Sequence, residues 1–176
     1  MGRARGDDDG ARRRALAALL GLAAVPWLAS CASKPPPPPP PPKPPPPPPK
    51  LDVSILAAPR LNPDANGRNS PVVVRVYELK SAARFASADF MSLFQQDSSA
   101  LGPDVVARDE FVLQPDGLKS INRLLSPETQ AIGVMVAFRD LDRAKWRAVV
   151  DLAPGRDNSV TVELDGLDVK VSRSGP

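Results

Sequence analysis

The sequence predicts a mainly β protein, a two-sheet β-sandwich with a short helical insertion. From residue 51 onward, apolar and polar residues alternate in short runs, which is the pattern of half-buried strands. About eight such runs are separated by short turns, the number expected of a β-sandwich. Residues 51–176 are enough for one domain with its own core, so we expect them to form the sandwich domain.

The strands are expected in a regular order along the chain. They fall at residues 51–57, 72–77, 105–113, 118–124, 132–138, 146–152, 160–164 and 167–171. The fifth run is almost wholly apolar, which favours a central strand buried on both faces. Pro115-Asp116-Gly117 predicts a turn between the third and fourth runs. Asp165-Gly166 lies between the last two alternating runs, and a two-residue Asp-Gly loop is a strong hairpin signal.

One segment, residues 81–102, departs from the strand pattern. Phe85, Phe90, Leu93 and Phe94 follow helical spacing, and Gly102-Pro103 is a typical helix stop. We therefore expect a short helical insertion whose aromatic stripe packs against the sandwich.

The N-terminal 30 residues have the parts of an export signal: the basic patch Arg12-Arg13-Arg14, an apolar run and small residues before Cys31. The apolar run is shorter than the roughly 20 residues that span a bilayer. One interpretation is a plain secretory peptide that leaves Cys31 as a free thiol. The other is a lipoprotein signal peptide over residues 1–30, because Leu28-Ala29-Ser30-Cys31 resembles the bacterial lipobox. That resemblance implies cleavage before Cys31 and acylation of its thiol, and several acyl chains anchor a protein firmly.

A proline-rich stalk is expected over residues 31–50, after the signal peptide. Of the 23 prolines, 14 lie between Pro35 and Pro49, interrupted only by Lys43. Proline fixes φ and lacks an N–H, so such a segment favours an extended polyproline helix. At about 3.1 Å per residue, residues 34–50 would reach roughly 50 Å. The alternative role is a ligand for a proline-binding domain; those domains are mostly cytoplasmic, so we favour a spacer.

Composition argues against several functional classes. The net charge of +3 comes from the N-terminal part, because residues 51–176 hold 15 Lys and Arg against 17 Asp and Glu. The slightly acidic balance of the predicted domain gives no support for nucleic-acid binding. The chain has no histidine, which excludes imidazole-dependent triads. Asp109 and Glu110 would point to opposite faces of a strand, and Asp140 and Asp142 lie in an expected turn. We therefore expect no enzyme, no catalytic residue, no metal, no cofactor and no small-molecule substrate.

An ordered set of short motifs resembles the TssJ family, the outer-membrane lipoproteins of the bacterial type VI secretion system. The motifs are Asn62-Pro63-Asp64, Gly67-Arg68, Ser70-Pro71-Val72-Val73-Val74-Arg75-Val76-Tyr77-Glu78-Leu79-Lys80, Ala88-Asp89-Phe90, Leu93-Phe94, Leu101-Gly102, Ala137-Phe138-Arg139-Asp140 and Trp146-Arg147. The proline stalk is not part of the family pattern. The resemblance implies a transthyretin-like sandwich without enzymatic activity, placed at the periplasmic face of the outer membrane by its lipid. Ala32 after the cysteine, in place of aspartate, also resembles the outer-membrane class.

The resemblance also implies a partner and a site. Family members tether the periplasmic domain of the inner-membrane protein TssM, through the loop between the first two strands. Here that loop is residues 58–71, rich in prolines, asparagines and glycine, and longer than most sandwich connections. The implied partner-binding residues are Asn62, Pro63, Asp64, Asn66, Gly67, Arg68, Asn69 and Ser70. The alternative function is a lipid-anchored glycan- or peptidoglycan-binding module, for which only Tyr77 and Trp146 offer stacking aromatics after the signal.

Overall fold

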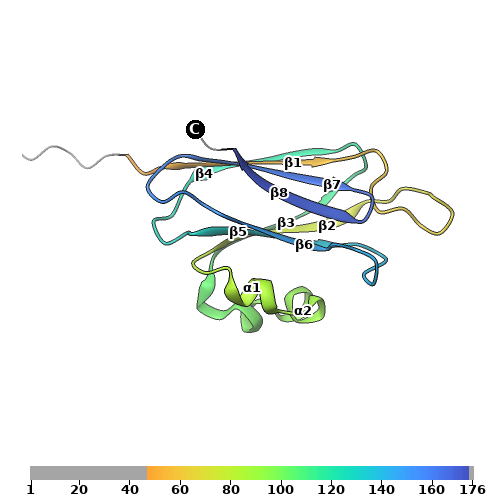
Figure 1. Ribbon diagram of the computed structural model, residues 1–176, viewed down its shortest axis with the longest axis horizontal. Coiled ribbons are helices and arrows are strands. Elements are labelled where there is room, and N and C mark those ends of the chain that lie inside the picture. Colours follow the sequence, from red (N-terminus) through yellow and green to blue (C-terminus); the bar gives the residue numbers. More distant parts are fainter. Residues whose placement is uncertain (1–46, 175–176) are drawn as a thin grey trace, which may run out of the picture. The chain divides into compact units, whose positions relative to one another are not determined.

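The computed structural model describes residues 47–174, and these form two four-stranded sheets that face each other (Figure 1). The strands are β1 (Lys50–Ala57), β2 (Val72–Leu79), β3 (Val105–Leu113), β4 (Leu118–Leu124), β5 (Ala131–Ala137), β6 (Arg147–Asp151), β7 (Asn158–Asp165) and β8 (Asp168–Ser174). The first sheet has the order β4-β1-β7-β8, and the second has the order β3-β2-β5-β6. The predicted two-sheet sandwich is confirmed. The signal peptide, Cys31 and most of the stalk lie outside the described residues.

All strand pairs are antiparallel except β1 and β7, which run parallel. The turn at residues 115–117 does not close a hairpin, because it carries the chain from β3 in the second sheet to β4 in the first. The last hairpin differs from the prediction by one residue. Asp165 pairs with Asp168, so the two-residue loop is Gly166-Leu167, with Gly166 at φ +61°. Glycine takes the first central position because it adopts positive φ without steric cost.

The main core lies between the sheets and is built from the inward residues of alternating strands. Val72, Val74 and Val76 on β2 face Val160 and the other apolar side chains of the first sheet. β5 is an interior strand buried on both faces, as its apolar run predicts. β1 begins one residue before the predicted boundary, and the carbonyl of Pro49 accepts the N–H of Leu125 at 2.7 Å. The folded domain therefore includes the last residues of the proline-rich segment.

Helices α1 (Ala83–Ser87) and α2 (Phe90–Leu101), followed by the 3-10 helix η1 (Gly102–Asp104), cover the outer face of the second sheet (Figure 1). The carboxylate of Asp89 caps α2 by accepting the N–H of Ser92. Phe85 and Leu93 are fully buried in a second core. Gly133 makes room for this layer, because a Cβ there would lie 3.0 Å from the Phe85 ring.

The aromatic stripe of the insertion packs inward only in part. Phe94 is 37% exposed and stacks on Phe90, with ring centroids 5.4 Å apart. The stripe divides because Phe85 lies on α1 and the other three residues on α2. Leu93 and Phe94 are also consecutive, so in a helix with 3.6 residues per turn they point in different directions.

A buried charge network fastens α2 to the sheet. Arg75 of β2 is 9% exposed and donates to the carbonyls of Leu93 and Phe94, both at 2.9 Å. The hydroxyl of Tyr77 donates to Asp97 at 3.0 Å, and burial raises the pKa of Tyr77 to about 12. Burial alone would raise the pKa of Asp97, but hydrogen bonds from Arg108 and Tyr77 outweigh it and the pKa is lowered. The Asp97 carboxylate, with these two partners, therefore stays ionised between α2 and the sheet.

Two negative observations apply to residues 47–174. No helix there is long and apolar enough to cross a membrane. The same residues bring together no group of three or more acidic, cysteine or histidine side chains that could hold a metal ion.

Candidate protein-binding loop

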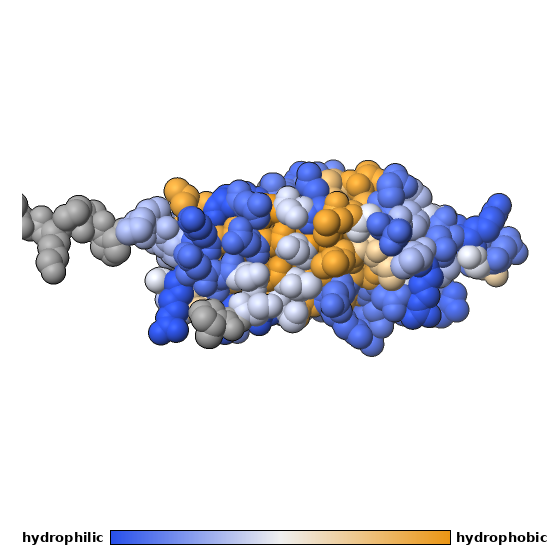
Figure 2. Space-filling model, turned by 90° about the horizontal axis from the view of Figure 1, so that it is seen from above, coloured by the Kyte–Doolittle hydropathy of each residue, from blue (hydrophilic) through white to orange (hydrophobic). Residues whose placement is uncertain are grey.

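The loop between β1 and β2, residues 58–71, projects beyond one end of the sandwich (Figure 1). It contains no strand, as its breakers predict. Its base is nevertheless part of the fold, since Leu61 is fully buried in the main core. The N–H of Asn62 donates to the carbonyl of Gly166 at 2.8 Å, which ties the loop to the β7–β8 turn. Figure 2 shows the projection as mostly hydrophilic, while apolar and neutral side chains gather over the middle of the sheet face.

Asn62 supports the loop and offers little surface to a partner. It is 4% exposed and adopts φ +48°. Its amide nitrogen donates to the carbonyl of Pro71 at 3.1 Å, and its amide oxygen accepts the N–H of Arg139 at 3.0 Å. Asparagine suits the position because it tolerates the left-handed region and carries both a donor and an acceptor. Among the eight expected binding residues, the Asn62 side chain is therefore occupied by contacts within the fold and is not available to a partner.

Asp64 organises the tip of the loop. One carboxylate oxygen accepts the N–H groups of Asn66 at 2.8 Å and Arg68 at 2.9 Å, and the other accepts Nε of Arg68 at 2.7 Å. Gly67 completes the turn at φ +76°. Hydrogen bonds from the backbone and then the side chain of Arg68 hold the pKa of Asp64 below its ordinary value. The tip is therefore a closed, internally bonded turn.

The remaining expected residues divide by exposure. Asn66, Gly67, Arg68 and Asn69 are exposed, whereas Pro63, Asp64 and Ser70 are half-buried. The side chain of Arg68 is 79% exposed even though Nε is paired with Asp64. The structure thus brings six of the eight residues to the surface of one projection, whereas Asn62 and the side chain of Asp64, which is 10% exposed, hold the loop together.

A second loop, between β5 and β6, lies against the first and was missed by sequence reasoning. Pro63 and Ala65 on one side, and residues 139–143 on the other, line a groove of about 440 Å³. Arg139 joins the two loops, because its backbone N–H bonds to Asn62 and its Nη2 donates to the hydroxyl of Ser70 at 2.9 Å. The sequence did predict a turn at Asp140–Asp142. It did not predict that this turn lies beside residues 62–70, because no local pattern relates the two segments.

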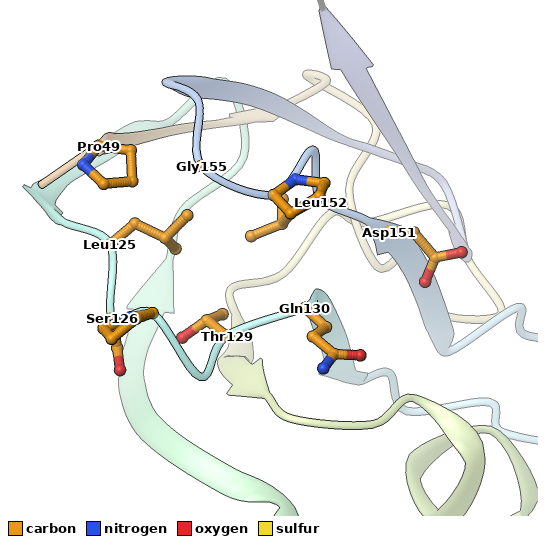
Figure 3. A pocket seen from close by; sticks show the side chains of 10 residues that line it. Pro49, Leu125, Ser126, Thr129, Gln130, Asp151, Leu152 and Gly155 are labelled. Atoms are coloured by element: carbon orange, nitrogen blue, oxygen red, sulfur yellow. The ribbon is translucent and has the colours of Figure 1, made fainter.

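A larger hollow of about 640 Å³ lies at the other end of the sandwich, where β1 begins (Figure 3). Its lining is Pro49, Leu125, Ser126, Pro127, Thr129, Gln130, Asp151, Leu152, Pro154 and Gly155. No aromatic ring stands in that lining. The two aromatics considered for sugar stacking are also engaged elsewhere: Tyr77 is fully buried, and Trp146 packs edge-on against Phe90 at 5.3 Å. These positions give little support to the glycan-binding alternative.

Comparison with known proteins identifies the family. Residues 49–167 match the T6SS-SciN family, described as type VI secretion lipoprotein, VasD, EvfM, TssJ. The chain belongs to the TssJ family. The matched region runs from the residue before β1 through the β7–β8 turn and includes both loops of the candidate site. The family consists of secretion lipoproteins rather than enzymes. No match was found among curated proteins.

Three solved structures illustrate the similarity to the TssJ family. The T6SS lipoprotein TssJ1 from Pseudomonas aeruginosa is 37% identical, with a TM-score of 0.70, over 74% of this chain and 99% of that one. A chain of a structure described as "Type VI membrane complex" is 30% identical, with a TM-score of 0.61, over 70% and 97%. A chain of a structure described as "T6SS protein TssM C-terminal domain (869-1107) from EAEC" is 29% identical, with a TM-score of 0.58, over 70% and 97%. The match therefore covers nearly the whole of the TssJ1 chain.

Proposed function

We propose that this protein is an outer-membrane-anchored lipoprotein of the type VI secretion membrane complex, and that its β1–β2 loop binds the periplasmic domain of TssM. The observation that carries the proposal is the architecture of the loop. It projects from one end of the domain, its base is bonded to the fold through Asn62, and its tip is closed by Asp64. An ordered projection with exposed polar side chains suits protein recognition.

Two of the similar structures support this proposal. One is described as a type VI membrane complex, and the other is named for the TssM C-terminal domain. In the second case the match covers 97% of the similar chain but only 70% of this 176-residue one. A chain of that length is much shorter than a fragment spanning 869–1107, as expected if a TssJ-like chain stands beside the TssM fragment.

The position of the loop within the domain fits a tether. The chain enters the sandwich at Lys50 and reaches the loop after the eight residues of β1, a distance of about 26 Å at 3.3 Å per residue. The loop lies at the end of the domain opposite Lys50, where the chain enters the sandwich (Figure 1). A contact surface at that end is available to a partner rooted in the other membrane.

The order of the loop has an energetic consequence for binding. Ordering a mobile segment on association costs free energy, and a loop already held in one conformation avoids much of that cost. Exposed Arg68 is the expected hot spot, because arginine is enriched among residues that dominate interface energies.

The test is a replacement of residues 63–69 by a short Gly-Ser link that keeps Leu61, Asn62 and Ser70. We expect the melting temperature of the purified domain, residues 47–176, to change little, because the replaced residues lie outside the core. Affinity for the periplasmic domain of TssM should fall tenfold or more by calorimetry, which is about 1.4 kcal/mol.

Matched variants sharpen this experiment. Arg68→Ala should weaken binding, whereas Arg156→Ala, an exposed arginine near the other end, should not. Undiminished binding after the loop replacement would move the interface to another surface. If the intact domain fails to bind TssM but sediments with purified peptidoglycan, the glycan-binding alternative is favoured.

A further inference from the structure

We infer that the groove between the β1–β2 and β5–β6 loops is a second part of the binding surface and that it receives a carboxylate of the partner at Arg139. This inference rests on the proposed function and deepens it. It adds residues from a segment that lies 77 positions along the chain from Asn62.

The groove is held open by contacts that do not depend on a partner. The backbone N–H of Arg139 is fixed by the buried amide oxygen of Asn62. On the far wall, Arg143 and Asp140 form an ion pair within the β5–β6 loop. The β5–β6 loop is therefore held both against the base of the β1–β2 loop and by its own salt bridge, before any ligand arrives.

Charge pairing singles out Arg139. At this end of the domain, four other basic side chains each have a carboxylate partner: Arg60 with Asp165, Arg68 with Asp64, Arg143 with Asp140 and Lys145 with Asp168. Among the described residues, none places a carboxylate oxygen within 4 Å of the Arg139 guanidinium. Asp64 interacts with it only at longer range, and the side chain that Arg139 hydrogen-bonds is the neutral hydroxyl of Ser70. A guanidinium carries five N–H donors, so an exposed Arg139 keeps donors for a ligand.

The surroundings define the chemistry of the ligand. Two N–H groups of a guanidinium match the two oxygens of a carboxylate, which makes this pairing stronger and more directional than that of an ammonium. Pro63, Ala65 and Leu141 supply apolar surface beside Arg139 in the groove, which Asp140, paired with Arg143, and Asp142 also line. An acidic residue flanked by small apolar side chains, on an extended segment of the partner, fits this combination.

The experiment measures binding of the domain, residues 47–176, to the periplasmic domain of TssM. Arg139→Gln should lower affinity at least tenfold and should reduce its dependence on salt concentration, because an ionic contact is lost. Arg139→Lys should recover part of the loss. Arg156→Gln removes an exposed cation near the other end of the domain, and it should bind within twofold of the parent.

Ser70→Ala separates a ligand role from a positioning role. It removes the hydrogen bond between Arg139 and the loop but keeps the charge, so we expect a smaller loss of affinity than that of Arg139→Gln. A loss equal to that of Arg139→Gln would overturn the inference, because Arg139 would then act by holding the loop. Parent-like binding by Arg139→Gln would also overturn it, while a normal effect of the loop replacement would leave the proposed function intact. No binding by the parent domain would end both proposals.

Discussion

Replacing Asn62 tests whether the β1–β2 loop is held by the fold. Asn62→Ala removes both side-chain hydrogen bonds, to Pro71 and from Arg139, and leaves those backbone groups without partners. At about 1 kcal/mol for each bond, this loss is about 2 kcal/mol. Alanine at φ +48° adds about 1 kcal/mol, because a Cβ is disfavoured in the left-handed region.

Asn62→Gly separates the two effects. Glycine removes the same hydrogen bonds but adopts positive φ freely, so its cost should be about 2 kcal/mol. For a domain of this size, about 4 °C of melting temperature corresponds to 1 kcal/mol. We therefore expect decreases of roughly 12 °C for Asn62→Ala and 8 °C for Asn62→Gly, using the same conversion. Thermal unfolding of the domain and urea denaturation measure both.

The control is Asn69→Ala, which changes an exposed asparagine of the same loop and should stay within about 0.5 kcal/mol of the parent. The reasoning fails if Asn62→Ala is as stable as Asn69→Ala. If the alanine and glycine variants are equally stable, only the backbone-strain part of the argument fails, and the hydrogen-bond part stands. Both Asn62 variants should also bind TssM more weakly, since a loosened loop must be ordered on binding.

Three further predictions concern the helical layer, the loop tip and the anchor. Arg75→Ala should destabilise the domain by about 3 kcal/mol, because two carbonyls of α2 lose a charged donor. The amides of α2 should then exchange with solvent before those of the strands, and uniform exchange would contradict this prediction. Since the folded-state pKa of Asp64 is lowered, the tip should stay ordered below about pH 3.9 and loosen only as pH falls through that lower value. Amide shifts of Gly67 report this, and a midpoint at or above 3.9 would refute it. Cys31→Ser should release the protein from the outer-membrane fraction; continued attachment would show another anchor.

The strands could be predicted because their cause is local. Alternation of apolar and polar residues directly encodes which side faces the core, and Val72, Val74 and Val76 do face it. The near-continuous apolar run of β5 likewise reflects burial between the core and the helices. Strand order could not be predicted in this way, because the parallel pairing of β1 with β7 depends on residues about a hundred positions apart.

Local turn signals gave the place of each turn but not its geometry. The Asp-Gly pair predicted the last hairpin, yet the register follows the pairing of Leu164 with Val169, which both face the core. Burial of that pair fixes the loop at Gly166-Leu167, one residue later. Similarly, residues 115–117 form a turn as predicted, and the choice between a hairpin and a crossing to the other sheet is decided by the core.

The candidate site shows the same division between local and long-range causes. Prolines, asparagines and Gly67 predict a loop, but they do not distinguish the residues that hold it from those that a partner can reach. In sequence, Asn62, Asn66 and Asn69 look equivalent. The contact that separates them is the backbone N–H of Arg139, which belongs to another loop and makes Asn62 a buried support.

The same contact links support and recognition. Because Arg139 gives its backbone N–H to Asn62, its position is fixed by the buried base of the loop, while its exposed guanidinium keeps donors for a carboxylate. Asp64 works in a similar way at the tip, where it uses its carboxylate internally and leaves Arg68 exposed. In both places a buried or half-buried polar side chain forms hydrogen bonds within the fold. These bonds hold a neighbouring arginine in a fixed position at the surface. If the proposed interface is correct, this pairing of a support with a presented cation makes Arg68 and Arg139 the two residues on which recognition should depend most.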